Sequence, residues 1–597
     1  MKNHPLQPLP PPGNWLAATV LVIISGILLG DLKAQESEGR YISSFEVTTP
    51  PAKADNPPER TTADGTAAKS RGIDEFDPRK FEDYKAKAEQ GDAGAQALLG
   101  RCYATGQGVA QNPEEAVRWF RMAADQGDAR GQCGLGACYA RGLAVKQDSP
   151  EAAKWFLKAA SQGDAVAQSN LGKCYLVGEG VGKDAATGVK WLTKAAEQGI
   201  AADQLQLGIC HDRGVGTAHD AAAAAKWFRK AAEQGLALAQ AKLGLCYLMG
   251  DGIEKDAAAA VKWFRLAAEQ GESMAQCNLG FCYKSGEGVD VDFEESVKWF
   301  RLSANQNYTQ AQSNLGVAFH RGEGIEKNLA EAVKWYRKAA GQGHAEAQYY
   351  LGLCYSAGDG VGKDAAEAMN WYRMAASQGH AEAQANLGLC HYRGEGVAQD
   401  LAEAVRWYRK AAEQGCAHGQ YNLGVCYLHG HGIGKDAVVA VMWFRKAADQ
   451  GHALAQSNLG SCYADGLGVA EDATEAVAWL RKAAAQNQPE AEYNLGLRFQ
   501  TGEGVAKDDA EAVKWFRKAA EQGLAAAQFN LGGSYLAGEG VAMDPVEAYK
   551  WVLLANAQGF ELAKQIVPEL KLRLTPEQLA EARKRASAFK RLDRTNP

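Results

Sequence analysis

The feature that most constrains the fold of this chain is a period of 36 residues. A fixed period between 20 and 50 residues is the signature of a stacked repeat array, in which each unit buries its apolar face against its neighbours. The period divides residues 92–559 into thirteen units. Tryptophan marks it without a single insertion, at Trp119, Trp155, Trp191, Trp227, Trp263, Trp299, Trp335, Trp371, Trp407, Trp443, Trp479, Trp515 and Trp551.

Each unit is expected to form two helices. In residues 383–392, Ala383, Leu387 and Cys390 are spaced at i, i+4 and i+7, which places them on one helical face. A second apolar stripe with the same period follows in residues 401–414 and includes Trp407. The pattern therefore predicts an all-α chain of helix–turn–helix repeats, with the tryptophans in its core.

The ends of the second helix carry capping residues. Asp or Asn precedes this helix in every unit, as at Asp400, and Glu follows three residues later in nine units, as at Glu403. This spacing predicts an N-cap with a reciprocal capping box. Each unit closes with Gly, except where Asn307 and Asn487 stand. Asn is the best replacement for Gly in a left-handed C-cap, so this position is expected to have a positive φ.

The loop between the two helices is rich in glycine, as in "GEGV" at residues 394–397. Such a loop before a helix can cradle a phosphate group. Here the capping side chain already satisfies the amides that a phosphate would need, and Glu395 adds a negative charge. A helix rather than a strand precedes the loop. We therefore interpret it as a turn and expect no nucleotide binding.

The repeated unit resembles the Sel1-like repeat, a relative of the tetratricopeptide repeat. Leu-Gly occurs on the first helix in all thirteen units, as at Leu99-Gly100 and Leu351-Gly352, together with the Trp of the second helix. The resemblance covers about four-fifths of the chain. It implies a right-handed α/α solenoid, or superhelix, and a role in protein–protein interaction rather than one particular chemistry.

The N-terminal residues differ from the repeats. Residues 15–30 are sixteen apolar residues after a single Lys, short for a membrane span of about 20 residues. Residues 1–34 therefore read as a secretory signal peptide cleaved near Ala34, with an uncleaved N-terminal membrane anchor as the alternative. Both interpretations place the repeats outside the cytoplasm. We expect an exported protein of the periplasm or extracellular space, or one anchored in the inner membrane.

The segments beside the repeats are interpreted as a linker and two caps. Residues 35–75 are rich in Pro, Thr and charged residues, which predicts a disordered linker. Residues 76–91 look like a lone helix that caps the array. At the other end, residues 560–597 are predicted to form C-terminal capping helices, and Thr575 is a natural N-cap before Pro576.

Charge and cysteine content limit the possible partners. The net charge is −6 with acidic and basic residues interspersed, so the chain lacks the basic footprint of a nucleic-acid-binding protein.

Ten of the thirteen cysteines occupy one repeat position. Equivalent positions in neighbouring repeats should lie about one helix spacing apart, too far for a disulfide. The cysteines are therefore predicted to be buried thiols.

One stretch gathers potential metal ligands, within residues 416–432. Cys416 and His418 begin a predicted helix, whereas His429 and His431 end it about 16 Å away, at 1.5 Å per residue. Because only His429 and His431 could share an ion, we expect no metal site and no other cofactor. No acid–base constellation stands outside the repeats, so we expect no enzymatic activity.

The candidate partner-binding surface lies on the first helices, opposite their apolar stripe. In the related repeat family this face lines a concave groove that holds the ligand. Exposed aromatic rings, Arg and amides would suit an extended peptide, although the Asn residues could instead stabilise the stack. The candidate residues are Tyr349, Tyr421, Tyr493 and Phe529 at the sixth position, Arg141, Arg213, Arg321 and Arg393 at the fourteenth, and Asn386, Asn422 and Asn458 at the seventh.

These observations predict a non-enzymatic scaffold of the bacterial cell envelope. It would bind a protein or peptide partner in its groove, as a monomer, and would contact the membrane only through an uncleaved N-terminal segment. The alternative is a saccharide- or peptidoglycan-binding envelope protein, because a groove lined by Tyr and Asn also suits sugars.

Overall fold

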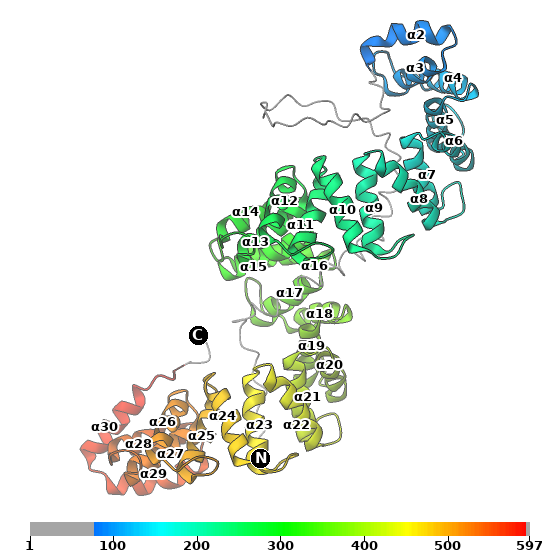
Figure 1. Ribbon diagram of the computed structural model, residues 1–597. Coiled ribbons are helices and arrows are strands. Elements are labelled where there is room, and N and C mark those ends of the chain that lie inside the picture. The colour runs from blue at the N-terminus through cyan, green and yellow to red at the C-terminus, as the bar shows by residue number, and fades with distance from the viewer. Residues whose placement is uncertain (1–76, 593–597) are drawn as a thin grey trace. The chain divides into compact units, whose positions relative to one another are not determined.

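The computed structural model describes residues 77–592, and all regular structure within that range is helical. It comprises 29 α-helices and one short 3-10 helix, η2 (Pro78–Lys80). Figure 1 labels the α-helices. The all-α prediction is confirmed. The described residues form two compact units, 77–327 and 328–592. The predicted signal peptide or anchor and the predicted linker lie outside the described residues.

Every repeat contributes a first and a second helix. Within each compact unit, the two helices of a repeat pack against each other and against the neighbouring pair. The first helices are α3 (Ala93–Thr105), α5 (Ala129–Arg141), α7 (Ala165–Val177), α9 (Ala201–Arg213), α11 (Ala237–Met249), α13 (Ser273–Ser285), α15 (Thr309–Arg321), α17 (Ala345–Ala357), α19 (Ala381–Arg393), α21 (Ala417–His429), α23 (Ala453–Asp465), α25 (Pro489–Thr501) and α27 (Ala525–Ala537).

The second helices alternate with them along the chain. They are α4 (Pro113–Asp125), α6 (Ser149–Ser161), α8 (Ala185–Glu197), α10 (Ala221–Glu233), α12 (Ala257–Glu269), α14 (Phe293–Asn305), α16 (Leu329–Gly341), α18 (Ala365–Ser377), α20 (Leu401–Glu413), α22 (Ala437–Asp449), α24 (Ala473–Ala484), α26 (Asp509–Glu521) and α28 (Pro545–Ala557).

Three further helices flank the repeats. Helix α2 (Phe81–Glu89) packs on α3, while α29 (Glu561–Arg573) and α30 (Pro576–Ser587) both pack on α28. Thr575 caps α30: its hydroxyl accepts the Gln578 amide N–H at 3.3 Å, and the Gln578 side chain accepts the Thr575 amide N–H at 2.9 Å. This reciprocal pair is a full capping box.

Only one of the two hydrogen bonds of the predicted capping box forms at the N-terminus of the second helices, which corrects that prediction. Asp400 accepts the Glu403 amide N–H at 2.9 Å, as expected. Glu403, however, does not bond back to Asp400 but pairs with Arg406 at 3.0 Å. The reason is that the Asp400 amide already donates to the His391 carbonyl of the first helix, at 2.9 Å. The same backbone bond ties Asp148 to Tyr139 at 3.0 Å, and Glu151 likewise turns outward and pairs with Lys154 at 3.0 Å.

The glycine-rich loop is a turn whose geometry requires glycine twice. Gly394 ends α19 with a φ of 73°, and Gly396 has a φ of 75°. A methyl group on Gly396 would lie 2.3 Å from the Ala365 carbonyl oxygen in the preceding repeat. The loop therefore packs directly against its neighbour. At the end of the repeat, Gly415 has a φ of 88° and Asn487 a φ of 59°, which confirms the predicted left-handed caps.

The core of each repeat is centred on the residue after the tryptophan, which corrects the sequence prediction. Tyr408 is fully buried and presses on Gly388 of the Leu-Gly pair, where an added methyl would lie 2.7 Å from the Tyr408 ring. Trp407 is only half-buried, and the Lys410 ammonium lies 4.2 Å from its ring centroid. Of the thirteen repeat tryptophans, those that are buried are Trp119, Trp479 and Trp551.

The cysteines are core residues, as predicted. All thirteen are buried free thiols. Burial raises the pKa of the Cys138 thiol to about 11 and that of the Cys426 thiol to about 12. These groups are therefore protonated at neutral pH and pack as small apolar side chains.

A pair of side-chain amides, one buried and one at the surface, joins most helical pairs to the pair before them. Gln384 of α19 donates to the Ala376 carbonyl of the preceding repeat at 3.2 Å. Its own carbonyl oxygen accepts from Gln414, at the end of α20, at 2.7 Å. The equivalent Gln96 and Gln126 are joined at 2.7 Å near the start of the array. Each amide satisfies a buried partner, so the pair fixes the spacing between successive repeats.

Candidate functional site

The candidate surface was predicted from Tyr349, Tyr421, Tyr493 and Phe529, here called the aromatic row. The structure places all four side chains half-buried, whereas the sequence predicted exposed rings. Tyr349 stacks on His380 with ring centroids 4.7 Å apart, and Tyr421 stacks on His452 at 4.8 Å. The cause is the register of the stack: the sixth position of one repeat lies beside the residue that begins the next first helix.

The other two rings of the row have aromatic neighbours as well. Tyr493 lies against Phe516, with centroids 5.9 Å apart, and Phe529 against Phe560 at 5.3 Å. Each ring is thus held from within and keeps part of its surface at the face of the first helices. A ring fixed in this way loses little conformational freedom when a partner contacts it.

The phenol groups of the row are neutral at physiological pH. Burial raises the pKa of Tyr421 to about 12, although a hydrogen bond with Asn458 acts in the opposite direction. Burial also raises the pKa of Tyr493, which is hydrogen-bonded to Asn530. In both pairs, the Asn at the seventh position of one repeat bonds to the Tyr at the sixth position of the repeat before it.

The asparagines at the seventh position of the repeats, here called the Asn ladder, therefore contact neighbouring repeats at several positions. Asn386 and Asn422 are buried, with 4% and 7% of their surface exposed, so their amides do not face a partner. Asn458 is half-buried. Elsewhere in the ladder, Asn494 donates to the Ser461 hydroxyl of the preceding first helix at 3.4 Å. These contacts favour the alternative in which the amides stabilise the packing of neighbouring first helices.

The four predicted arginines lie at the C-terminal ends of first helices. Arg213 and Arg321 are exposed, while Arg141 and Arg393 are half-buried. Arg321 lies 3.4 Å from the loop carboxylate of Glu323. An exposed ion pair of this kind contributes little to stability, so the Arg321 guanidinium could exchange Glu323 for an acidic partner.

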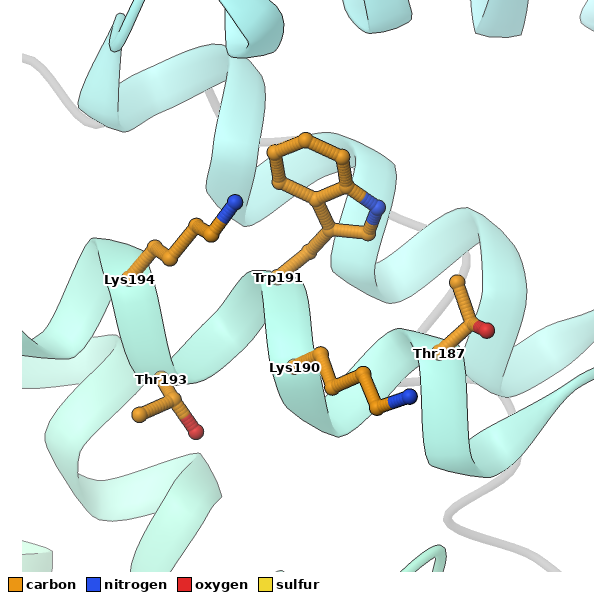
Figure 2. Close-up of a pocket in the computed structure, with 5 residues that line it drawn as sticks. All are labelled: Thr187, Lys190, Trp191, Thr193 and Lys194. Carbon is orange, nitrogen blue, oxygen red and sulfur yellow. The ribbon is translucent and has the colours of Figure 1, made fainter.

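One half-buried tryptophan, Trp191 of α8, lines a shallow hollow on its helix. Figure 2 shows this hollow, which is lined also by Thr187, Lys190, Thr193 and Lys194. The Lys194 ammonium lies 4.2 Å from the Trp191 ring centroid. Because this cation covers the indole face, the hollow presents positive charge rather than a bare ring for stacking.

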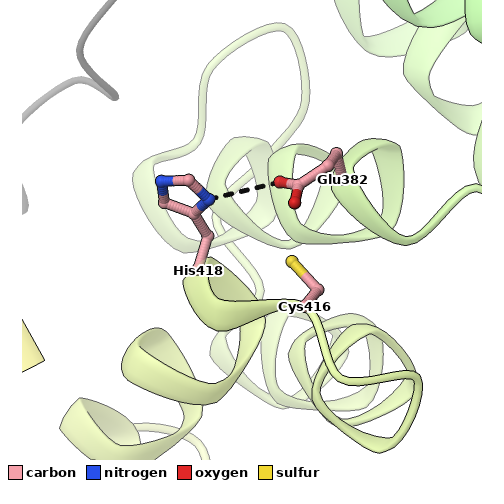
Figure 3. Close-up of side chains that lie close together, drawn as sticks. All are labelled: Glu382, Cys416 and His418. Carbon is pink, nitrogen blue, oxygen red and sulfur yellow. Dashed lines mark ion pairs between the residues drawn. The ribbon is translucent and has the colours of Figure 1, made fainter. Parts of the chain in front are cut away.

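The structure also rearranges the potential metal ligands. His429 and His431 stack on each other, with ring centroids 5.4 Å apart, at the end of α21. At the other end of α21, Cys416 and His418 meet a residue of the preceding repeat, Glu382, as Figure 3 shows. The His418 Nδ1 atom lies 3.3 Å from a Glu382 carboxylate oxygen.

Analysis of a single helix misses Glu382, because this residue belongs to α19. A usable signal was present: the first two or three residues of successive first helices should meet along the stack. The paired glutamines were missed for the same reason, since each partner stands on a different helix. Their signal in the sequence is an amide at the same two places in nearly every repeat.

The chain is similar to known repeat proteins. Thirteen consecutive segments match the Sel1 repeat: residues 93–128, 129–164, 165–200, 201–236, 237–272, 273–308, 309–344, 345–380, 381–416, 417–452, 453–488, 489–524 and 525–560. No curated protein matches the sequence.

Among solved structures, one similar protein is c5321, a protective antigen of uropathogenic Escherichia coli strains with an SLR fold. It is 39% identical, with a TM-score of 0.63, over 73% of this chain and 94% of that chain. A Sel1 repeat protein from Oxalobacter formigenes is 36% identical over 41% of this chain and 96% of that one, with a TM-score of 0.39.

Proposed function

This chain belongs to the Sel1 repeat family, and from the surface of its first helices we propose that it is a non-enzymatic scaffold for a protein or peptide partner. Solenoids of this class are generally scaffolds for protein–protein interaction. Their repeats present the same helix face again and again, which gives an extended surface to one partner.

The observation that carries the proposal is the aromatic row. Tyr349, Tyr421 and Tyr493 recur at every second repeat, half-buried and braced by neighbouring rings. Rigid, partly exposed aromatic rings are enriched at the residues that dominate binding energy. An extended peptide laid across the first helices would meet one ring at each second repeat.

The cellular place of the scaffold is part of the same proposal. The apolar residues 15–30 support export to the cell envelope of a bacterium, either as a signal peptide or as an anchor. Within residues 77–592, none of the helices has the length and apolar character needed to span a membrane.

The proposal is tested by capture of partners from cell envelopes with the tagged full chain. Tyr493→Ala should weaken capture of a given partner by about 1–3 kcal/mol, or roughly 5-fold to 150-fold. The matched control is Tyr535→Ala, because Tyr535 is also half-buried but pairs with Arg517 of the second helix at 2.7 Å. The Tyr535→Ala variant should capture the same partner as well as the unaltered chain does.

Two outcomes would contradict the proposal. Equal loss of capture in both variants would show that the Tyr493 ring acts through stability alone. Loss of the captured material when peptidoglycan is digested beforehand would favour the saccharide-binding alternative. A partner that survives digestion and is lost only with Tyr493→Ala supports the protein scaffold.

A further inference from the structure

Three side chains with different metal-binding atoms meet where α19 and α21 come together. Glu382 lies in the first turn of α19, Cys416 caps the N-terminus of α21, and His418 lies in the first turn of α21 (Figure 3). One carboxylate oxygen, the thiol sulfur and one ring nitrogen all lie within 4.8 Å of one another. The three residues come from two neighbouring repeats, so their meeting is a product of the stack.

A glycine explains why the two first helices approach each other here. The fourth position of the repeat is Ala in the neighbouring helices, as at Ala383 and Ala455, but it is Gly419 in α21. A methyl group on Gly419 would lie 2.6 Å from the Ala411 side chain of α20, which no packed structure tolerates. Helix α21 therefore sits closer to its neighbours than alanine would allow, and it contacts α19 directly.

The chemistry of the cluster suits a borderline-soft divalent ion. Donor atoms around a tetrahedral Zn²⁺ stand about 3.5 Å apart, given bond lengths of about 2.0–2.3 Å, so small side-chain rotations would close the present spacing. A thiolate and an imidazole select Zn²⁺ over Mg²⁺ or Ca²⁺, which prefer oxygen ligands alone. The thiolate and the carboxylate would together balance the charge of the ion.

The cluster is buried at its thiol and reaches solvent at its carboxylate and imidazole. Cys416 is buried, whereas the side chains of Glu382 and His418 keep 20% and 18% of their surface exposed. The His418 ring is held by His452, which packs edge-on with centroids 5.1 Å apart. The His452 Nδ1 atom is itself engaged, because it accepts the Ala455 amide N–H at 3.2 Å. An ion could thus enter from solvent and find a ligand already oriented.

We propose that Glu382, Cys416 and His418 bind one Zn²⁺ ion, with a water molecule at the fourth position, and so clamp two neighbouring repeats together. On binding, the Cys416 thiol releases its proton to solvent, and the thiolate forms the bond to the ion. The clamp joins α19 to α21 by bonds that no other pair of repeats shares at this position. His452 links it to Tyr421 of the aromatic row, but the assignment of the ion does not rest on the function proposed above.

The test is titration of the full chain with Zn²⁺ by isothermal calorimetry, after removal of metal with a chelator. We expect one ion per chain and a higher melting temperature when Zn²⁺ is present. Glu382→Gln, Cys416→Ser and His418→Gln should each weaken binding by more than about tenfold, since even residues that only support a metal ligand have effects of that size. Substitution of Co²⁺ should produce a thiolate charge-transfer absorption that Cys416→Ser abolishes.

Matched controls separate this cluster from other imidazoles and from loss of folding. Cys416→Ser keeps an N-cap acceptor for the Gly419 amide, which the Cys416 sulfur accepts at 3.3 Å in the structure, so the helix should remain intact. The double variant His429→Gln/His431→Gln removes the stacked pair at the other end of α21 and should bind Zn²⁺ as the unaltered chain does. Mg²⁺ should produce no binding heat.

Several results would overturn the proposal. The first is the absence of Zn²⁺ binding to the full chain. The second is unchanged affinity in Cys416→Ser together with His418→Gln. The third is loss of binding in the His429→Gln/His431→Gln variant, which would assign the ion to that pair instead.

Discussion

Replacing Gly388 by Ala tests the contact on which each repeat is built. The added methyl group would lie 2.7 Å from the Tyr408 ring and 3.2 Å from the Ala404 carbonyl oxygen. Tyr408 is fully buried, so its ring cannot swing aside into solvent. Overpacking of this kind costs about 1–3 kcal/mol, against which the better helix propensity of Ala returns about 1 kcal/mol. The net destabilisation is then about 0–2 kcal/mol. Because the buried ring cannot move aside, we expect Gly388→Ala to lie in the upper half of this range, at about 1–2 kcal/mol.

The matched control is another helical glycine in the same compact unit. Gly341, at the end of α16, has no atom within 4 Å of the position that a methyl would occupy, and it is exposed. Gly341→Ala should therefore stabilise the chain by about 0.5–1 kcal/mol, the opposite sign for the same substitution.

Hydrogen exchange read by mass spectrometry is the appropriate assay, because neighbouring repeats can open locally without global unfolding. Peptides from α19 and α20 should exchange roughly 5–30 times faster in Gly388→Ala, which corresponds to about 1–2 kcal/mol. Urea unfolding followed by circular dichroism should rank the variants in the same order. Protection equal to or greater than that of the unaltered chain would refute the proposed ring-on-glycine contact.

Three further predictions concern buried polar groups. The Tyr408 hydroxyl has no hydrogen-bond partner among the described residues, so Tyr408→Phe should stabilise the chain by about 1 kcal/mol in urea unfolding. Tyr372→Phe is the control: it removes a hydroxyl that is bonded to Ser356 and should not stabilise the chain. Glu492 replaces the buried glutamine and has no N–H to donate, so Glu492→Gln should raise the melting temperature and add about 1 kcal/mol of stability. Burial lowers the pKa of His344 from the free value of 6.5 to about 4. As the pH falls from about 6.5 to about 4, the unfolded chain therefore takes up this proton before the folded chain does, and stability decreases. His344→Asn should flatten this pH dependence in thermal unfolding.

Local features of this fold could be predicted because they depend on local backbone chemistry. The positive φ of Asn487 and the cap at Asp400 follow from which side chains tolerate a left-handed residue or accept an amide N–H. The position of the central buried ring in each repeat could be predicted only to within one residue. Trp407 and Tyr408 share a helix face in the sequence pattern, and only the glycine opposite Tyr408 decides which ring is buried.

The candidate site was less accessible to prediction because it depends on contacts between repeats. The exposure of Tyr421 depends on His452, the first-position residue of the following repeat, which covers one side of its ring. Asn422 points into the stack for the same reason. The Glu382–Cys416–His418 cluster combines two helices and a glycine that brings them together, so no pattern within a single helix could predict it.

The amide chain formed by Gln384 and Gln414 has a consequence for how such a protein changes in length. Gln384 bonds to a carbonyl that every preceding repeat offers at the same place, as the equivalent bond from Gln420 to Ala412 shows. Deletion or duplication of one whole 36-residue unit would therefore restore this amide bond at the new junction. A cut of any other length would leave buried amides without partners. This contact between repeats is therefore compatible with arrays lengthened or shortened by whole units, and by itself it sets no particular number of units.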